Sequence, residues 1–251
     1  FIFVIVFGGL WGSFANVCIY RFPKNEGIVT GRSFCPNCKT KINWYDNIPL
    51  ISFLALGGKC RNCKKNISTQ YFIVETLSII LFTSIYYKFG VTLTTLYLII
   101  LSLSFLIIFF IDLKHFIIPN TLTFSLMIIG FIKSFDPNLN PMFPNYINSL
   151  IGGIFGYGII WSIIFIYKVV RKKEGMGLGD AKLFGAIGFW FGWVSIPFII
   201  FLSSITALIH VIPSLFNKSK NISSQIPFGP YIILATLIYV IFESNIKFLI
   251  F

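Results

Sequence analysis

Charged side chains are scarce in this sequence, and acidic ones are the scarcest: eight of its 251 residues are Asp or Glu. Charged residues make up 11% of the chain, whereas an ordinary soluble domain carries about a quarter. Hydrophobic residues make up 56%, including 30 Phe and 11 Tyr. One aqueous core cannot hide so much apolar surface. The composition therefore excludes an ordinary soluble globular protein and predicts a lipid bilayer as the solvent.

Long apolar runs supply the membrane spans that this composition requires. A helix crosses the hydrocarbon layer with about 20 apolar residues. Runs of that order occur at 1–20, 71–87, 91–111, 116–132, 147–167, 183–216 and 228–240. The run 183–216 is too long for one crossing, and we expect a tight turn near its middle, at 193–197. The sequence thus predicts an all-α polytopic membrane protein with about eight transmembrane helices.

Basic residues outnumber acidic ones by 20 to 8, and their positions explain the excess. If the N-terminus lies outside and eight helices alternate, 17 Lys and Arg fall in inner loops, and Lys88, Lys133 and Lys247 fall outside. This asymmetry is the positive-inside rule. If 183–216 were one crossing, Lys218 and Lys220 would move outside, and the earlier spans would keep their orientation. The basic charge therefore indicates topology and gives no reason to expect a nucleic-acid partner.

One long polar segment divides the chain. We expect a first transmembrane helix at 1–20, a cytosolic insert at 21–70 and a transmembrane bundle at 71–251. Small residues four apart let helices approach closely in lipid. The fifth span is therefore expected to present a packing face at Gly152, Gly153, Gly156 and Gly158.

Four of the five cysteines lie in the insert as two Cys-x-x-Cys pairs, Cys35 with Cys38 and Cys60 with Cys63. Two such pairs complete a tetrahedral thiolate site for zinc. The alternative is two disulfides, which rarely persist in the reducing cytosol where the topology puts this insert. Four protein ligands leave the metal no open position, so the predicted zinc is structural. Cys18, alone in an apolar run, is expected to be an inert buried thiol.

Two acidic residues stand out by position. Asp112 ends the third span, and Asp180 follows Gly177 and Gly179 before the sixth, so both fall at the same cytosolic depth. Ionisable groups near hydrocarbon are costly and are functional by default. Two close carboxyl groups share one proton, so one can act as base and the other as acid. The pair predicts a membrane aspartic endopeptidase, and the alternative for Asp180 is a simple helix N-cap.

A proton- or cation-coupled membrane transporter, with the cysteines as a regulatory zinc module, is the alternative from another functional class. Such a protein places its carboxylates near the bilayer midplane on discontinuous helices. The two aspartates are both expected at the cytosolic edge instead. A non-catalytic scaffold would leave the matched aspartates unexplained.

Short sequence motifs occur along nearly the whole chain, in the same order as in one known protein family. They lie at 12–23, 35–38, 44–49, 58–63, 71–75, 112 with 118–120, 177–182 and 227–231. Together they resemble the bacterial prepilin peptidases, the type IV leader peptidase/N-methyltransferase family of Gly-x-Gly-Asp membrane aspartic proteases. The resemblance covers all but the last part of the chain.

This resemblance implies a multi-pass enzyme of the bacterial inner membrane, with Asp112 and Asp180 as its catalytic pair on the cytosolic side. Family members remove the basic leader from type IV prepilins or pseudopilins. Many also N-methylate the new terminus with S-adenosylmethionine, an activity associated with the cysteine-bearing part. Substrate-binding or supporting roles are expected for Gly177, Gly179, Lys182, Glu75, Asn16 and Arg21. For Lys182 and Glu75, anchoring at the membrane interface is the alternative.

Overall fold

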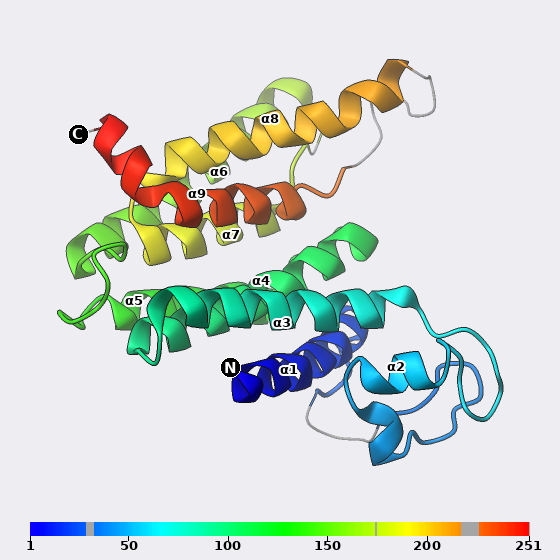
Figure 1. Cartoon of the computed structure of the whole chain (residues 1–251). Helices are drawn as coiled ribbons and strands as arrows, with labels where there is room; N and C mark the ends of the chain where they lie inside the picture. Colours follow the sequence, from blue (N-terminus) through cyan, green and yellow to red (C-terminus); the bar gives the residue numbers. More distant parts are fainter. Residues whose placement is uncertain (29–32, 174, 217–225, 251) are drawn as a thin grey trace. The chain divides into compact units, whose positions relative to one another are not determined.

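The computed structural model describes residues 1–28, 33–173, 175–216 and 226–250. Within these residues the chain is almost entirely helical (Figure 1), and its only β-pairing is two isolated bridges, Phe34 with Lys41 and Lys59 with Asn66. The predicted all-α class is confirmed. The chain forms two compact units, Phe1–Ile107 and Ile108–Phe251. Four charged residues of the sequence, Arg32, Glu174, Lys218 and Lys220, lie outside the described residues.

In the first unit, α1 (Ile2–Arg21) packs along α3 (Thr69–Phe89), and α4 (Leu93–His115) begins. Glycines of α1 make this approach possible. A Cβ on Gly12 would lie 2.8 Å from the Cα of Glu75, and one on Gly8 would lie 3.0 Å from the Cα of Ile79. The α1 backbone therefore lies directly against α3, as small residues allow in membrane helices.

The polar insert lies between α1 and α3 in this unit. It contains two short 3₁₀ helices, η1 (Phe22–Lys24) and η2 (Trp44–Asn47), and one short α-helix, α2 (Ile51–Ala55). The rest of its described backbone consists of turns and loops (Figure 1). Short elements of this kind cannot bury a core of their own, so other contacts must hold the insert together.

The second unit holds the end of α4 and five more helices. These are α5 (Asn120–Lys133), α6 (Tyr146–Arg171), α7 (Leu178–Phe191), α8 (Ser195–Phe216) and α9 (Gly229–Ile250). Helix α7 is buried along most of its length and packs closely against α6. The Cβ atoms absent from Gly152 and Gly156 would collide with the carbonyls of Gly188 and Phe184.

The predicted glycine face of α6 is therefore confirmed for Gly152, Gly153 and Gly156. The prediction was wrong for Gly158, because a Cβ there would have no neighbour within 4 Å. Gly158 falls on another side of the helix, since it does not share the three- and four-residue spacing of the others.

Five of the described helices, α1, α3, α4, α6 and α8, are long and apolar enough to cross a membrane. Helix α5 and the described apolar part of α9 are shorter. The turn predicted within 183–216 is present, because α7 ends at Phe191 and α8 begins at Ser195, with a left-handed Gly192 (φ 79°) between them. The protein is thus a polytopic helical membrane protein, and a total of eight crossings stays a prediction.

Candidate functional site

Asp112 lies in the last turns of α4, and its side chain is buried with 4% of its surface exposed. Its Oδ2 accepts a hydrogen bond of 2.9 Å from the backbone N–H of Gly229, the first residue of α9. Backbone N–H groups at a helix start have no partner within the helix and carry partial positive charge. A Cβ at position 229 would lie 2.8 Å from the same oxygen. The absence of a side chain at Gly229 therefore allows this contact.

Asp180 lies in the first turn of α7 and is 8% exposed. The N-cap of this helix is Gly177, and no side chain caps it. Asp180 is therefore not the N-cap residue itself, but its carboxyl group interacts with the backbone N–H of Gly177 and helps to close the start of its own helix.

The starts of α7 and α9 meet at the side chain of Ile118. A Cβ on Gly179 would lie 3.0 Å from Ile118 Cβ, and one on Gly229 would lie 3.3 Å from Ile118 Cδ1. The carboxyl groups of Asp112 and Asp180 are close enough to interact electrostatically. The second unit thus brings together the two acids that the sequence singled out.

Lys182 does not contact either acid through a hydrogen bond. Its Nζ donates 2.7 Å to Oδ1 of Asn120, at the start of α5, and lies 5.4 Å from the ring centroid of Phe124. Lys182 instead ties the start of α7 to the start of α5.

Three predicted supporting residues lie in the first unit, and all three are buried. Glu75 Oε2 accepts 2.8 Å from the backbone N–H of Leu50, a residue held at φ 60°. Asn16 Nδ2 donates 3.2 Å to Tyr71 O, and Arg21 Nη1 donates 2.9 Å to Gly27 O. Glu75 is therefore not an exposed interfacial anchor. It fixes the insert against α3.

A cavity of about 440 Å³ lies between the insert and the adjoining ends of α1 and α3. Aromatic side chains on its lining are Tyr20, Phe34, Phe53 and Tyr71, and polar groups include Ser13 and Glu75. This volume falls within the range of about 300–1,000 Å³ typical of small-molecule pockets. The cavity therefore has the size and mixed polarity of a ligand site.

The four insert cysteines gather at one point, with every Sγ within 4.8 Å of the others. The Sγ atoms of Cys35 and Cys63 are 3.9 Å apart, and those of Cys38 and Cys60 are 4.0 Å apart. Zinc–sulfur bonds of about 2.3 Å in a tetrahedron would separate sulfurs by about 3.8 Å. All four are free thiols, so the disulfide alternative is not what the structure has. The cluster fits a metal ion such as zinc.

The two cysteine pairs have the same backbone arrangement. In the first, Lys39 N donates to Cys35 O and Cys35 N donates to Thr40 O. In the second, Lys64 N donates to Cys60 O and Cys60 N donates to Lys65 O. Lys39 and Lys64 both adopt left-handed conformations, with φ 56° and 57°. Each pair is thus a tight turn that presents two sulfurs to the same point.

Local hydrogen bonds lower the pKa of two of these thiols. Hydrogen bonds with Thr40 lower the pKa of Cys38 to about 6. Backbone N–H groups of Cys63 and then Asn62 lower the pKa of Cys60. Thiolates bind metals, whereas protonated thiols do not. At Cys38 and Cys60 the turns therefore favour the thiolate that a metal would need. At Cys63 a backbone hydrogen bond with Lys65 is outweighed by burial and by the neighbouring cysteines, which raise its pKa to about 11.

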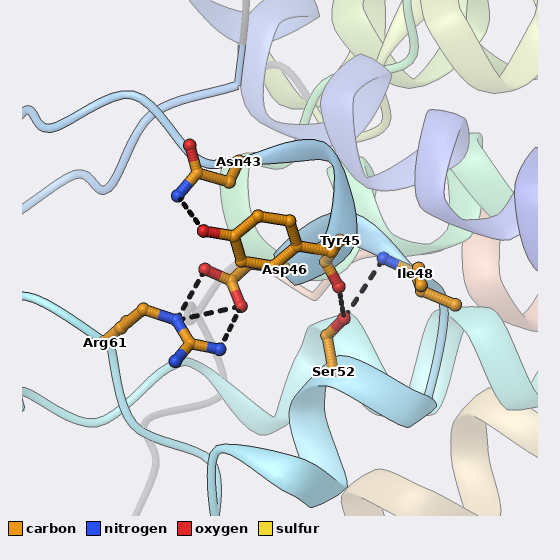
Figure 2. Close-up of polar contacts among 6 residues, drawn as sticks. All are labelled: Asn43, Tyr45, Asp46, Ile48, Ser52 and Arg61. Atoms are coloured by element: carbon orange, nitrogen blue, oxygen red, sulfur yellow. Dashed lines mark hydrogen bonds and ion pairs between the residues drawn. The ribbon is translucent and has the colours of Figure 1, made fainter.

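An ion pair joins the second cysteine turn to η2 (Figure 2). Arg61 Nε lies 2.8 Å from Asp46 Oδ2, and its Nη2 lies 2.7 Å from Oδ1. These hydrogen bonds from Arg61 lower the pKa of Asp46. Ser52 of α2 donates 2.8 Å to Tyr45 O and accepts 3.1 Å from Ile48 N. These contacts connect η2, α2 and the second cysteine turn.

The described geometry defines a class: a polytopic membrane protein with a buried pair of carboxyl groups and a four-cysteine insert. Two family models match the sequence of this chain. The bacterial peptidase A24 N-terminal domain matches residues 6–89, and the type IV leader peptidase family matches residues 99–212. The chain belongs to the type IV leader peptidase family. No solved structure matches the chain.

Relatives support the same assignment over almost the whole length. A Pseudomonas aeruginosa protein is 34% identical over 265 residues, which cover 96% of this chain and 90% of that protein. A Vibrio cholerae protein is 38% identical over 235 residues, which cover 90% of each chain. Both are named prepilin leader peptidase/N-methyltransferase. The comparisons support the predicted peptidase and give the transporter alternative no support.

Sequence reasoning found both acids and all four cysteines but missed two residues of the acid site. Gly229 and Ile118 lie in motifs that carried the resemblance, at 227–231 and 118–120. Their contacts with the acid site join segments far apart in the chain. Neither Gly229 nor Ile118 has a titratable side chain that would have drawn attention to it.

Proposed function

We propose that this protein is a prepilin leader peptidase that also N-methylates the N-terminus it exposes. Membership of the leader peptidase family supports the reaction. The observation that carries the site assignment is the meeting of Asp112 and Asp180 beside Gly229. Within this proposal, residues 1–20 form the first span, 21–70 the zinc-binding insert and 71–251 the catalytic bundle.

In the proposed cleavage, the two aspartates share one proton. The hydrogen bond from Gly229 favours negative charge on Asp112, so Asp112 is assigned as the base and Asp180 as the acid. Asp112 takes a proton from water as the water oxygen attacks the scissile carbonyl carbon, and Asp180 donates its proton to the carbonyl oxygen. When the tetrahedral intermediate collapses, the C–N bond breaks, the amine leaves with the proton that Asp112 took up, and Asp180 regains a proton from a hydroxyl group of the intermediate.

The distribution of basic residues between the loops indicates on which side of the membrane the proposed substrate is cleaved. With 17 of 20 basic residues assigned to inner loops, the C-terminal end of α4 and the start of α7 lie at the cytosolic face of a bacterial inner membrane. The proposed substrate is therefore a prepilin or pseudopilin whose basic leader remains on that side. Gly177, where a Cβ would lie no closer than 3.7 Å to Asp180 Oδ2, leaves room beside Asp180 for an extended peptide backbone, whereas Gly179 supports the site by packing against Ile118.

The insert is proposed to hold zinc and to bind the methyl donor. Cys35, Cys38, Cys60 and Cys63 would bind the ion and hold the two turns together. S-adenosylmethionine supplies an electrophilic methyl group when bound. The aromatic lining of the cavity, Tyr20, Phe34, Phe53 and Tyr71, suits an adenine ring, and the polar Ser13 and Glu75 can orient its polar groups.

The test of the peptidase assignment is leader removal from a prepilin by the full chain in liposomes. Asp112→Asn and Asp180→Asn each keep the shape of the side chain but remove its acid–base function. Each is expected to lower the cleavage rate by about 10²- to 10⁴-fold. Asp136→Asn, between α5 and α6, removes the same charge elsewhere and should leave the rate unchanged. A near-normal rate for either of the first two variants would refute the acid pair.

A further inference from the structure

The C-terminal end of α7 poses a hydrogen-bonding problem. This helix has 14 residues, about 21 Å of length, whereas the hydrocarbon layer is about 30 Å thick. The last carbonyl groups of a helix have no partner within it, and unsatisfied carbonyls are expensive where water is absent. Helix α7 therefore needs donors from other parts of the chain at this end.

Neighbouring helices supply two of these donors. Ser149 Oγ of α6 donates 2.7 Å to Phe189 O. Lys133 Nζ, from the last residue of α5, donates 3.0 Å to Trp190 O. The end of α7 is thus held by side chains from the two helices that pack most closely against it.

Lys133 is an unusual donor because none of its surface is exposed. Its Nζ lies 3.9 Å from the ring centroid of Phe143 and 5.2 Å from that of Trp190, distances at which a ring face attracts a cation. In the described part of the chain no acidic group lies within ion-pair distance of it. A cation at a helix C-terminus is also favoured by the helix dipole. The sequence placed Lys133 among the outer cations and gave no sign of this burial.

Helices α5 and α7 are tied at both ends. At their starts, Lys182 Nζ donates to Asn120 Oδ1, and at their ends, Lys133 Nζ donates to Trp190 O. Between these ties, Trp190 Nε1 donates 2.8 Å to Leu126 O. A Cβ on Gly130 would lie 2.6 Å from the Trp190 ring, so this glycine admits the indole against α5. The two helices run parallel, and these ties fix their relative axial position.

We propose that Lys133 is a positioning residue for the reaction: by holding the end of α7 against α5, it sets the depth of Asp180 relative to Asp112. Trp190 follows Asp180 by ten residues on the same helix, about 15 Å along its axis. A buried helix moves as a unit, so a slip at its far end changes the separation of the two acids. The expected effect of Lys133 on catalysis rests on the proposed function. Its effect on the position of α7 rests only on the contacts described above.

The experiment compares Lys133→Met, which keeps an unbranched apolar chain and removes the donor, with Phe82→Leu. Phe82 is a fully buried ring of the first unit that packs against Phe7, and its variant controls for general loss of packing. For each, kcat and KM for prepilin cleavage are measured with the full chain in liposomes. A second readout places Cys at positions 112 and 180 and follows their joining by a short bifunctional thiol reagent, with the linked peptide identified by mass spectrometry.

We expect Lys133→Met to lower kcat by roughly 10- to 100-fold with KM within about twofold, and to slow joining of positions 112 and 180. Phe82→Leu should leave both readouts close to wild type. The inference is overturned if Lys133→Met keeps the wild-type kcat, leaves the joining rate unchanged, or behaves like Phe82→Leu. If Lys133→Met does not fold, Lys133→Gln is judged by the same criteria. If the wild type cleaves no prepilin, the proposed function fails while the joining rate still decides the role of Lys133.

Discussion

At the scale of single residues, the acid site depends on a glycine as much as on its carboxyl groups. Asp112 could be predicted as a functional residue because few acidic residues lie near the apolar runs of the sequence. Its partner Gly229 was not, because the two residues are 117 positions apart and a backbone N–H carries no sequence signal. Spacing and composition predict which side chains are costly to bury, but tertiary contacts decide what stabilises them.

The contact between Gly229 and Asp112 leads to a direct prediction. In Gly229→Ala the new Cβ would lie 2.8 Å from Asp112 Oδ2, so the carboxyl group must move. We expect kcat for leader cleavage to fall about 10- to 100-fold. Gly158→Ala makes the same chemical change where no atom lies within 4 Å, and it should cleave at the wild-type rate. Equal rates for the two variants would show that the position of this oxygen is unimportant.

At the scale of elements, apolar runs predicted most helices to within a few residues, and the exceptions have local causes. Helix α5 begins at Asn120 instead of Phe116, because Pro119 disfavours helical backbone in the residue before it. Helix α7 begins at Leu178, before the apolar run, so its first turn carries Asp180. Hydropathy alone does not mark a helix start that contains an acid.

The insert brings its four cysteines together with little regular structure. Its two cysteine turns, one ion pair and short helices have no sizeable core, so bound metal should provide much of its stability. We expect Cys60→Ser to lose zinc and to lower the melting temperature by roughly 5–10 °C, with a smaller effect on the rate of peptide cleavage. Zinc content and thermal unfolding of the purified full chain provide the measurement.

Cys18→Ala is the matched control for Cys60→Ser, because Cys18 is buried in α1 and lies outside the cluster. It should keep a wild-type zinc content. If the purified wild type folded normally with no metal bound, the structural role assigned to the cluster would be wrong.

At the scale of the whole molecule, the two proposed activities lie in different units of the chain. The cavity is lined by residues of the first unit, whereas Asp112 and Asp180 belong to the second. The sequence predicted the polar insert from its composition, but a cavity requires side chains from several short segments to converge. No motif in the sequence described that convergence.

Cofactor binding and peptide cleavage should therefore be separable. Tyr71→Leu removes an aromatic ring from the cavity and should weaken binding of S-adenosylhomocysteine about tenfold or more, measured by calorimetry. Tyr86→Leu makes the same change near the other end of α3 and should bind normally. Asp112→Asn should bind normally while failing to cleave. Undiminished binding by Tyr71→Leu would place the cofactor elsewhere.

The bond between Gly229 and Asp112 also has a consequence for how the protein is made. Asp112 emerges from the ribosome long before Gly229, the first residue of α9. A nascent chain that has not reached α9 lacks the donor that holds this carboxyl group. The acid pair is therefore completed only when synthesis has passed the start of α9, so a half-inserted polypeptide lacks the finished form of the proposed catalytic centre.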